Sequence, residues 1–316
     1  MNNTHFLSVP VGYGGEIEFS VEGTTTDAIV DYVGYSSDGI TPGGAFHAIN
    51  PARVADSRTP TPSCLCAPIP PHSTGYAGYS NDTNGQPTGA GTQAFGGVLV
   101  HVTAVAPTSA GYLTVWSPTA NSDGTFPPTA PGTPPTTTSV SFTGHQSAGN
   151  TAYVQHATAS TGTGYAYVAI YNGSASTLNY VVDLQGYQAS TTDLQSPVSP
   201  HTRIEDSRNC GSVGGMLCTK LSAGVPSHFN VFRRGPVPDA GMKGALLHVV
   251  TLNATGTGYL QVWNPDQAMP LSSLNQIIPS TVVGDAAYVP ISSTGSIEIE
   301  SAVSTDVIIE IEGWTG

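Results

Sequence analysis

The residues best suited to chemistry form a short motif that occurs twice. Each copy reads Arg-x-x-Asp-Ser-Arg, and together the copies hold half of the 8 cationic residues. Their charged members are Arg53, Asp56 and Arg58 in the first copy and Arg203, Asp206 and Arg208 in the second. Such groups can form a bidentate structural clamp, or they can bind a carboxylate or a sugar. Because the motif is repeated, we favour a clamp that fastens the entry strand of each repeat.

The spacing within the motif constrains its pairing. Residues two apart on an extended strand share a face, whereas residues three apart point to opposite faces. The Asp and the second Arg of each copy can therefore bridge directly. The first Arg must reach across a turn or donate to backbone carbonyl oxygens.

Cysteines follow each copy of the motif. They are Cys64, Cys66, Cys210 and Cys218. The second pair flanks a Gly-rich loop whose ends can meet, so we expect a local disulfide there; a disulfide within the closer first pair would be strained. A zinc site built from all four is the less favoured alternative, because the pairs belong to separate repeats and no His lies at ligand spacing near them.

Motifs typical of enzymes are missing from the sequence. It contains no His-Glu-x-x-His, no Gly-x-Ser-x-Gly and no phosphate-binding Gly-x-x-x-x-Gly-Lys. His101 and His248 each head an apolar strand, and we expect them to be hydrogen-bonded core or interface histidines rather than ligands. The sequence therefore predicts neither catalysis nor a cofactor or metal.

These residues lie in an internal repeat. Leu247 to Trp263 reproduces Val100 to Trp116 without a gap, including the shared pattern Gly-Tyr-Leu-x-Val-Trp. Both repeats end in a β-branched strand followed by Gly and an aromatic residue, and this ending also occurs near the start of the chain. We therefore predict three parts: the C-terminal half of a repeat over 1–38, repeat one over 39–190 and repeat two over 191–316.

The half-repeat is expected to need a partner. It would supply only the closing strands of a sandwich and would expose an apolar face and unpaired strand edges. Its candidate assembly residues are Ile17, Phe19, Ile29, Val30 and Val33. The expected partner is another copy of the chain, in a homo-oligomer or a larger symmetric assembly.

Composition and patterning favour an all-β fold. Only 9% of the residues are charged, against roughly 25% in ordinary soluble proteins. Short alternating or continuous apolar runs are separated by turn residues, and almost no helical periodicity is present. The sequence predicts tandem antiparallel β-sandwich domains, with a jelly-roll strand order as one candidate. Repeat one carries an additional Pro-rich insertion over 125–136, expected to be an exposed excursion rather than a docking arm.

The charge excludes two classes of partner. The net charge is −13, and no Lys or Arg occurs between Arg58 and Arg203. Nucleic acids and anionic membranes both attract basic segments, so neither is expected to bind. No apolar run approaches the roughly 20 residues of a membrane span. The N-terminus lacks the basic and apolar regions of a signal peptide, which favours a mature fragment or another route of export.

The motifs resemble tandem repeats of secreted actinobacterial and related bacterial surface proteins, a type that also suits phage virion proteins. Those repeats begin with Pro-x-Arg-Leu-Leu-Asp-Thr-Arg, matched here by 51–58 and 200–208, and end with Ser-Thr-Asp-Val-Ile, matched by 304–308. This chain differs in its cysteines and in placing His101 and His248 where Asn is usual. The resemblance implies an accessory or surface module.

Together these observations predict a non-enzymatic structural building block located outside a cell or on a virion surface. We favour a phage decoration, tail or fibre component that contacts capsid or tail proteins. The alternative is a secreted cell-surface module that binds polysaccharide. Tyrosines near loops allow core packing, subunit contact or glycan contact; they are Tyr76, Tyr79, Tyr165, Tyr167 and Tyr171.

Overall fold

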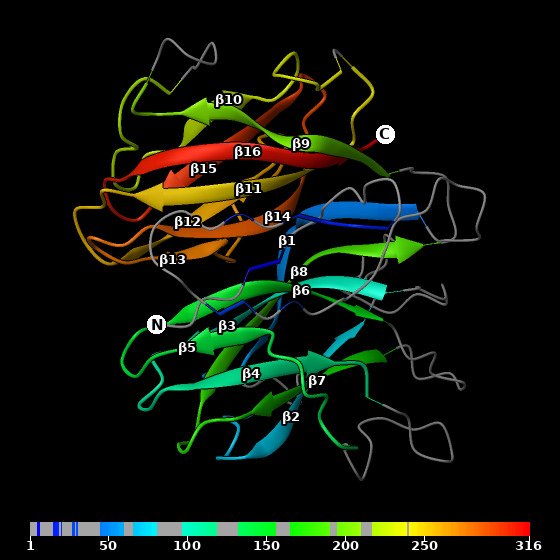
Figure 1. Cartoon of the computed structure of the whole chain (residues 1–316), viewed down its shortest axis with the longest axis vertical. Helices are drawn as coiled ribbons and strands as arrows, with labels where there is room; N and C mark the ends of the chain where they lie inside the picture. Colours follow the sequence, from blue (N-terminus) through cyan, green and yellow to red (C-terminus); the bar gives the residue numbers. More distant parts are fainter. Residues whose placement is uncertain are drawn as a thin grey trace.

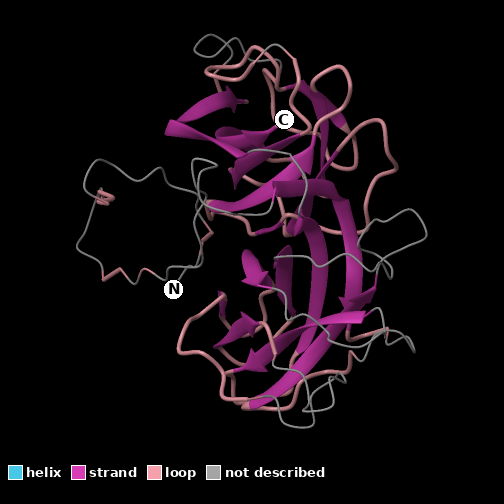
Figure 2. Cartoon of the chain, turned by 90° about the vertical axis from the view of Figure 1, so that its right-hand side faces the viewer, coloured by secondary structure: helices cyan, strands magenta, loops and turns pink. Residues whose placement is uncertain are grey.

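The structure is a computed structural model that describes residues 5–6, 15–18, 20, 27–28, 30, 45–59, 66–80, 97–118, 132–155, 165–189, 195–209, 217–238 and 240–316. Every regular element in these ranges is a β-strand (Figure 2). Within the same ranges, no helix is long and apolar enough to cross a membrane. The expected all-β fold is confirmed.

Sixteen strands in the described ranges form two matching sets. The first set is β1 (Ala45–Asp56), β2 (Ser73–Ser80), β3 (Gly97–Val105), β4 (Gly111–Trp116), β5 (Val140–Phe142), β6 (Ala148–Gln155), β7 (Tyr165–Asn172) and β8 (Asn179–Ala189). The second is β9 (Gln195–Asp206), β10 (Ser227–Asn230), β11 (Gly244–Leu252), β12 (Gly258–Trp263), β13 (Asn275–Ile277), β14 (Val283–Pro290), β15 (Ser296–Ser301) and β16 (Asp306–Thr315).

Each set folds into two antiparallel four-stranded sheets. Repeat one has the orders β1-β8-β3-β6 and β2-β7-β4-β5, and repeat two has the same orders with each strand replaced by its counterpart. The first strand of each repeat pairs with its last, and early and late strands interleave in both sheets. This is the strand order of a jelly roll, so the candidate topology is also confirmed.

Each jelly roll has its own apolar core. Residues from both sheets of repeat one pack together, including Val98, Val100 and Ile170, and repeat two has an equivalent cluster around Val249 and Ile299. The alternation of a strand sends Val98 and Val100 into this core and turns their neighbours to the opposite face. Each repeat therefore buries enough apolar surface to form a sandwich by itself.

The two jelly rolls pack against each other through the outer faces of the sheets that contain β3 and β11 (Figure 1). A third apolar cluster, here called the interdomain seam, contains Phe46, Leu99, Leu246, Ala286 and Tyr288. The rings of Phe46 and Tyr288 have centroids 4.2 Å apart. This contact covers the outer face of β3, which explains why nearly every residue of that strand is buried.

Few residues of the expected half-repeat over 1–38 are described, so its closing strands stay a prediction. Ile17 and Val30 lie outside any strand and are 42% and 58% exposed, whereas Phe19, Ile29 and Val33 lie outside the described residues. Each jelly roll already contains its own closing strand, so neither offers a position for additional ones. The expected boundaries near 38 and 190 also fall outside the described ranges, as does most of the Pro-rich insertion; residues 132–136 form no strand.

Candidate functional site

The first Arg motif lies at the end of β1. Arg53 donates from Nε to Asp183 Oδ1 at 2.7 Å and from Nη2 to Oδ2 at 3.1 Å, reaching the neighbouring strand β8. Arg58 donates from Nε and Nη2 to the Asp56 carboxylate at 2.8 and 2.6 Å. Arg53 Nη2 also donates to the backbone oxygen of Leu271 in repeat two, at 3.0 Å. The motif thus connects two strands and both repeats.

The second motif repeats this arrangement with looser contacts. Arg208 donates from Nε and Nη2 to Asp206 at 2.8 and 2.7 Å. Arg203 contacts Glu310 on β16 at 3.2 Å and Asp206 at 3.4 Å. Asp183 is almost completely buried at 1% exposure, whereas the Glu310 side chain is 27% exposed.

Asp183 and Glu310 are the partners that the spacing of the motif did not identify. The available signal was their matched position: both carboxylates occur in the closing strand of a repeat, three residues before the final Gly. The guanidinium groups of the motifs contact carboxylates of the same chain, which leaves them poorly placed to bind an external anion. That the motifs act as clamps stays a prediction.

Burial and ion pairing shift these carboxyl groups in opposite directions. Hydrogen bonds from Arg58 lower the pKa of Asp56, and those from Arg208 lower the pKa of Asp206. Burial raises the pKa of Asp183 above its usual value, although Arg53 opposes that effect. Of these carboxyl groups, Asp183 therefore depends most on its ion pair to stay ionised.

The first of the repeated histidines forms a buried contact between the repeats. His101 is 0% exposed, and its Nε2 lies 2.8 Å from Asp285 Oδ2 on β14. Its Nδ1 lies 3.5 Å from Thr103 Oγ1. The expectation of a hydrogen-bonded interface histidine is confirmed at this position. Because Asp285 is only 2% exposed, the pair is shielded from water.

His248 occupies the equivalent position on β11 but has different neighbours. Its Nδ1 lies 3.6 Å from Glu310, and its ring centroid is 6.3 Å from that of His5 in edge orientation. The backbone nitrogen of Phe6 donates to Asn150 Oδ1 at 3.2 Å, and Phe6 packs against the interdomain seam. Residues 5–6 therefore lie between the repeats, which makes the two histidine environments unequal.

Both histidines require a glycine on the adjacent strand. A Cβ atom at position 149 would lie 2.5 Å from His101 Cε1, and one at position 284 would lie 2.6 Å from His248 Nε2. Real Cβ atoms essentially never approach so closely. Gly149 and Gly284 thus leave the space that each imidazole ring fills, and this His/Gly pair is part of the repeat.

The acidic surroundings of His248 make the stability of the protein depend on pH. Burial lowers the pKa of His248, but Glu310, Glu312 and Asp285 outweigh it and raise the pKa above 6.5. A histidine whose pKa is higher in the folded state than in the unfolded state stabilises the fold. The stabilisation is complete below the pKa of the unfolded state and is lost as the pH rises through the pKa of the folded state. We therefore expect the stabilising contribution of His248 to be lost as the pH rises above about 6.5.

The measurement is urea denaturation between pH 5.5 and 8.5. His248→Gln should remove this part of the pH dependence, because the amide does not titrate. A matched substitution at His228, whose side chain is 49% exposed, serves as the control. An unchanged pH profile in the His248 variant would contradict the assignment.

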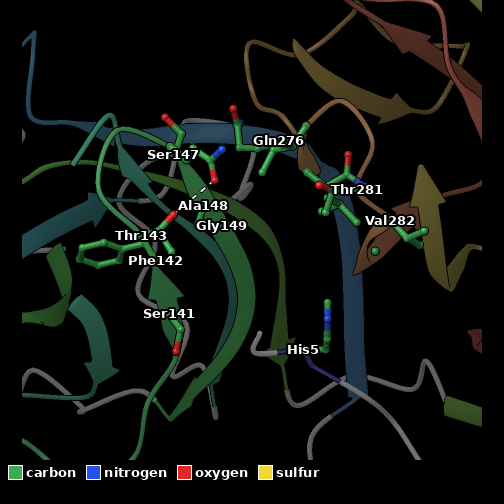
Figure 3. Close-up of a pocket in the computed structure, with 15 residues that line it drawn as sticks. His5, Ser141, Phe142, Thr143, Ser147, Ala148, Gly149, Gln276, Thr281 and Val282 are labelled. Atoms are coloured by element: carbon green, nitrogen blue, oxygen red, sulfur yellow. Dashed lines mark hydrogen bonds between the residues drawn. The ribbon is translucent and has the colours of Figure 1, made fainter. Parts of the chain in front are cut away.

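A small groove runs between the repeats beside these histidines (Figure 3). Its walls come from the segments between Ser141 and Gly149 and between Asn275 and Gly284, with His5 at one end. In the strand registers Ser141 corresponds to Gln276 and Gly149 to Gly284, so the same part of each repeat faces the groove. Equivalent segments of the two repeats therefore line the groove.

The groove is not built like a small-molecule site. Its cavity volume is about 80 Å³, well below the roughly 300–1,000 Å³ typical of ligand pockets. Apart from His5, its lining carries hydroxyl, amide and apolar groups but no charged side chain. Among the described residues, no group of three or more His, Cys, Asp or Glu side chains could hold a metal.

Neither described cysteine is free. Cys66 and Cys218 are both disulfide-bonded, and Cys66 is 1% exposed in the core of repeat one. Cys64 and Cys210 lie outside the described residues, so no complete cysteine pair is described and the expected pairing stays a prediction.

Comparisons with known proteins assign no family. No family model and no curated protein matches the sequence. A structure described as the triple jelly roll fold and turret assembly in an archaeal virus has 15% identity and a TM-score of 0.19, over 79% of this chain and 59% of that one. A Sulfolobus Turreted Icosahedral Virus structure has 12% identity and a TM-score of 0.18, over 78% and 58%.

The third match is a CBM22-1-CBM22-2 tandem domain from Paenibacillus barcinonensis Xyn10C. It has 10% identity and a TM-score of 0.19, over 86% of this chain and 100% of that chain. This chain spans less than two thirds of the two viral chains. Similarities this low assign neither a family nor a function.

Proposed function

We propose that this chain is a non-enzymatic structural building block of an extracellular assembly, in the role of a phage virion surface protein such as a decoration, tail or fibre component. The observation that supports it most is the interdomain seam. Leu99 and Leu246 are each 2% exposed there, and the buried His101–Asp285 contact lies beside them. An interface of this kind joins two jelly rolls through buried contacts, which suits a repeating component.

The described part of the N-terminal segment also supports assembly. Ile17 and Val30 are 42% and 58% exposed, and apolar side chains gain free energy when a partner covers them. The expected partner is another copy of this chain.

The assembly prediction is tested with two variants. Full-length protein should form a homo-oligomer at micromolar concentration in light scattering, and the chain lacking 1–38 should be smaller. Because that truncation also removes His5 and Phe6 from the seam, the double substitution Ile17→Asp and Val30→Asp is the sharper test. It should weaken assembly without unfolding either jelly roll. A monomeric wild type, or variants that assemble equally well, would contradict the proposal.

A second candidate is a secreted cell-surface module that binds polysaccharide. It is favoured by aromatic side chains on the outer face of the β2-β7-β4-β5 sheet, where repeat one differs from repeat two. Polysaccharide binding by a chain that remains monomeric would support this candidate over the virion role.

A further inference from the structure

Five aromatic side chains share one face of a sheet in repeat one. Val168 and Ile170 on β7 point into the core, so Tyr167, Ala169 and Tyr171 lie on the opposite face. The same alternation on β2 and β4, whose residues Ala77, Leu113 and Val115 are in the core, turns Tyr76, Tyr112 and Trp116 outward. These aromatic residues, here called the aromatic face, are Tyr76, Tyr112, Trp116, Tyr167 and Tyr171.

The strand register brings these rings together. Ala169 pairs with Tyr76 on one side and with Trp116 on the other, and its small side chain is 0% exposed between them. Tyr112 and Tyr171 have ring centroids 6.2 Å apart at an angle of 48°. Tyr112 is 38% exposed, and the other four residues are half-buried. Two of the rings therefore contact each other, and solvent reaches the set in part, although the Tyr76 hydroxyl group is buried.

A glycine fixes the position of the most exposed ring. A Cβ atom at Gly173 would lie 2.3 Å from Tyr112 Cζ, so the tyrosine ring rests directly on the backbone there. The backbone nitrogen of Gly173 also donates to the Tyr112 carbonyl oxygen at 2.9 Å. In repeat two the matching bond runs from Ala302 to Tyr259, where a methyl group occupies that space.

Repeat two provides a natural comparison because its sheet has the same register. Tyr112 and Trp116 correspond to Tyr259 and Trp263, but the remaining positions have changed character. Tyr76, Tyr167, Ala169 and Tyr171 correspond to His228, Ser296, Glu298 and Glu300. His228 and Glu298 lie 3.6 Å apart. The aromatic face belongs to repeat one alone, and its counterpart is charged.

The chemistry of this face fits a sugar polymer. An aromatic ring packs against the C–H groups on one side of a pyranose ring, while tyrosine hydroxyl groups offer hydrogen bonds. The face itself has no charged residue among its members, and the chain carries a net charge of −13, which repels acidic polymers. Several rings spread over three strands suit consecutive sugar units better than one small molecule.

We propose that the aromatic face of repeat one binds a neutral polysaccharide. The inference deepens the second candidate function above, and it is independent of the assembly role. Its occupant is a chain of uncharged pyranose units that packs on Tyr112 and Tyr171. A protein partner on the same face is the competing outcome of the test.

The experiment measures binding of full-length protein to neutral polysaccharides. Native affinity electrophoresis is run with xylan, β-glucan, galactomannan and glucomannan, with polygalacturonate as the acidic comparison. At least one neutral polymer should retard the wild type, and polygalacturonate should not. Tyr112→Ala and Tyr171→Ala should each weaken binding about tenfold, and Gly173→Ala should weaken it by displacing the Tyr112 ring. Tyr112→Phe, which keeps the ring, should retain most of the affinity.

Tyr259→Ala is the matched control, because it removes the equivalent exposed tyrosine of repeat two, which is 45% exposed. It should leave binding unchanged. Light scattering and melting temperatures of the same samples separate loss of a binding site from loss of assembly or folding. Failure of wild type to bind any neutral polymer, equal loss in Tyr259→Ala, or a change of oligomeric state in Tyr112→Ala without loss of glycan binding would each overturn the proposal.

Discussion

Arg53→Ala should destabilise repeat one by about 3–5 kcal/mol, the cost of breaking a buried ion pair by removing one partner. Arg53 makes two hydrogen bonds to Asp183, whose side chain is 1% exposed. Without the guanidinium group, the Asp183 carboxylate would remain buried and unpaired. The contact from Arg53 to Leu271 in repeat two would be lost as well.

The loss should depend on pH in a defined direction. Burial already raises the pKa of Asp183 above 3.8, and removal of Arg53 takes away the group that opposes this increase. When the pKa of a carboxyl group is higher in the folded state, the folded state holds the proton more tightly. The carboxyl group therefore lowers the stability of the protein as the pH rises above the pKa of the unfolded state. The difference between wild type and variant should therefore be smaller near pH 4 than at pH 7.

Urea denaturation of wild type and two control variants checks this prediction. Arg203→Ala is the matched control in repeat two, and a loss of about 1 kcal/mol is expected because Glu310 is partly exposed. Arg58→Ala, at a 48% exposed side chain, should cost about 0–1 kcal/mol. Equal losses of stability in all three variants would contradict the prediction that the buried Arg53–Asp183 pair contributes more than the exposed pairs.

Leu99→Asp should separate the two jelly rolls without unfolding either of them. Leu99 is 2% exposed but belongs to the interdomain seam rather than to the core of its own repeat. Loss of a buried leucine side chain alone costs about 2–5 kcal/mol, and a buried, unpaired carboxylate adds to that cost. We expect the domains to part because separation hydrates the new charge.

Calorimetry and small-angle scattering test this outcome. The two domains of wild type should unfold together in one transition. Leu99→Asp should show two separate unfolding transitions and a larger radius of gyration. Leu246→Asp, at the equivalent position across the seam, should behave in the same way. Leu271→Asp, at an 83% exposed residue, should change stability by less than about 0.5 kcal/mol. Loss of all folded structure in Leu99→Asp would mean that the repeats do not fold independently.

Much of the fold could be predicted because it depends on local pattern. Short apolar runs and turn residues predicted the sandwiches, and the matched segments ending at Trp116 and Trp263 predicted the repeat. The strand order remained open, since pairing between β1 and β8 joins residues that are far apart in sequence. The strands expected over Phe6 to Tyr35 stay a prediction, since few residues of that range are described.

The composition of the motifs can be read from the chain alone: which residues repeat, where cations are concentrated and which positions are aromatic. The partners of these residues depend on how the strands pack. Arg53 pairs with Asp183 across neighbouring strands, and His101 meets Asp285 across two domains. The physical reason is that alternation along a strand fixes which face a side chain occupies, whereas the element packed against that face depends on long-range pairing. The partner of a buried charge is therefore set by the packed fold and cannot be identified from the spacing of residues within a motif.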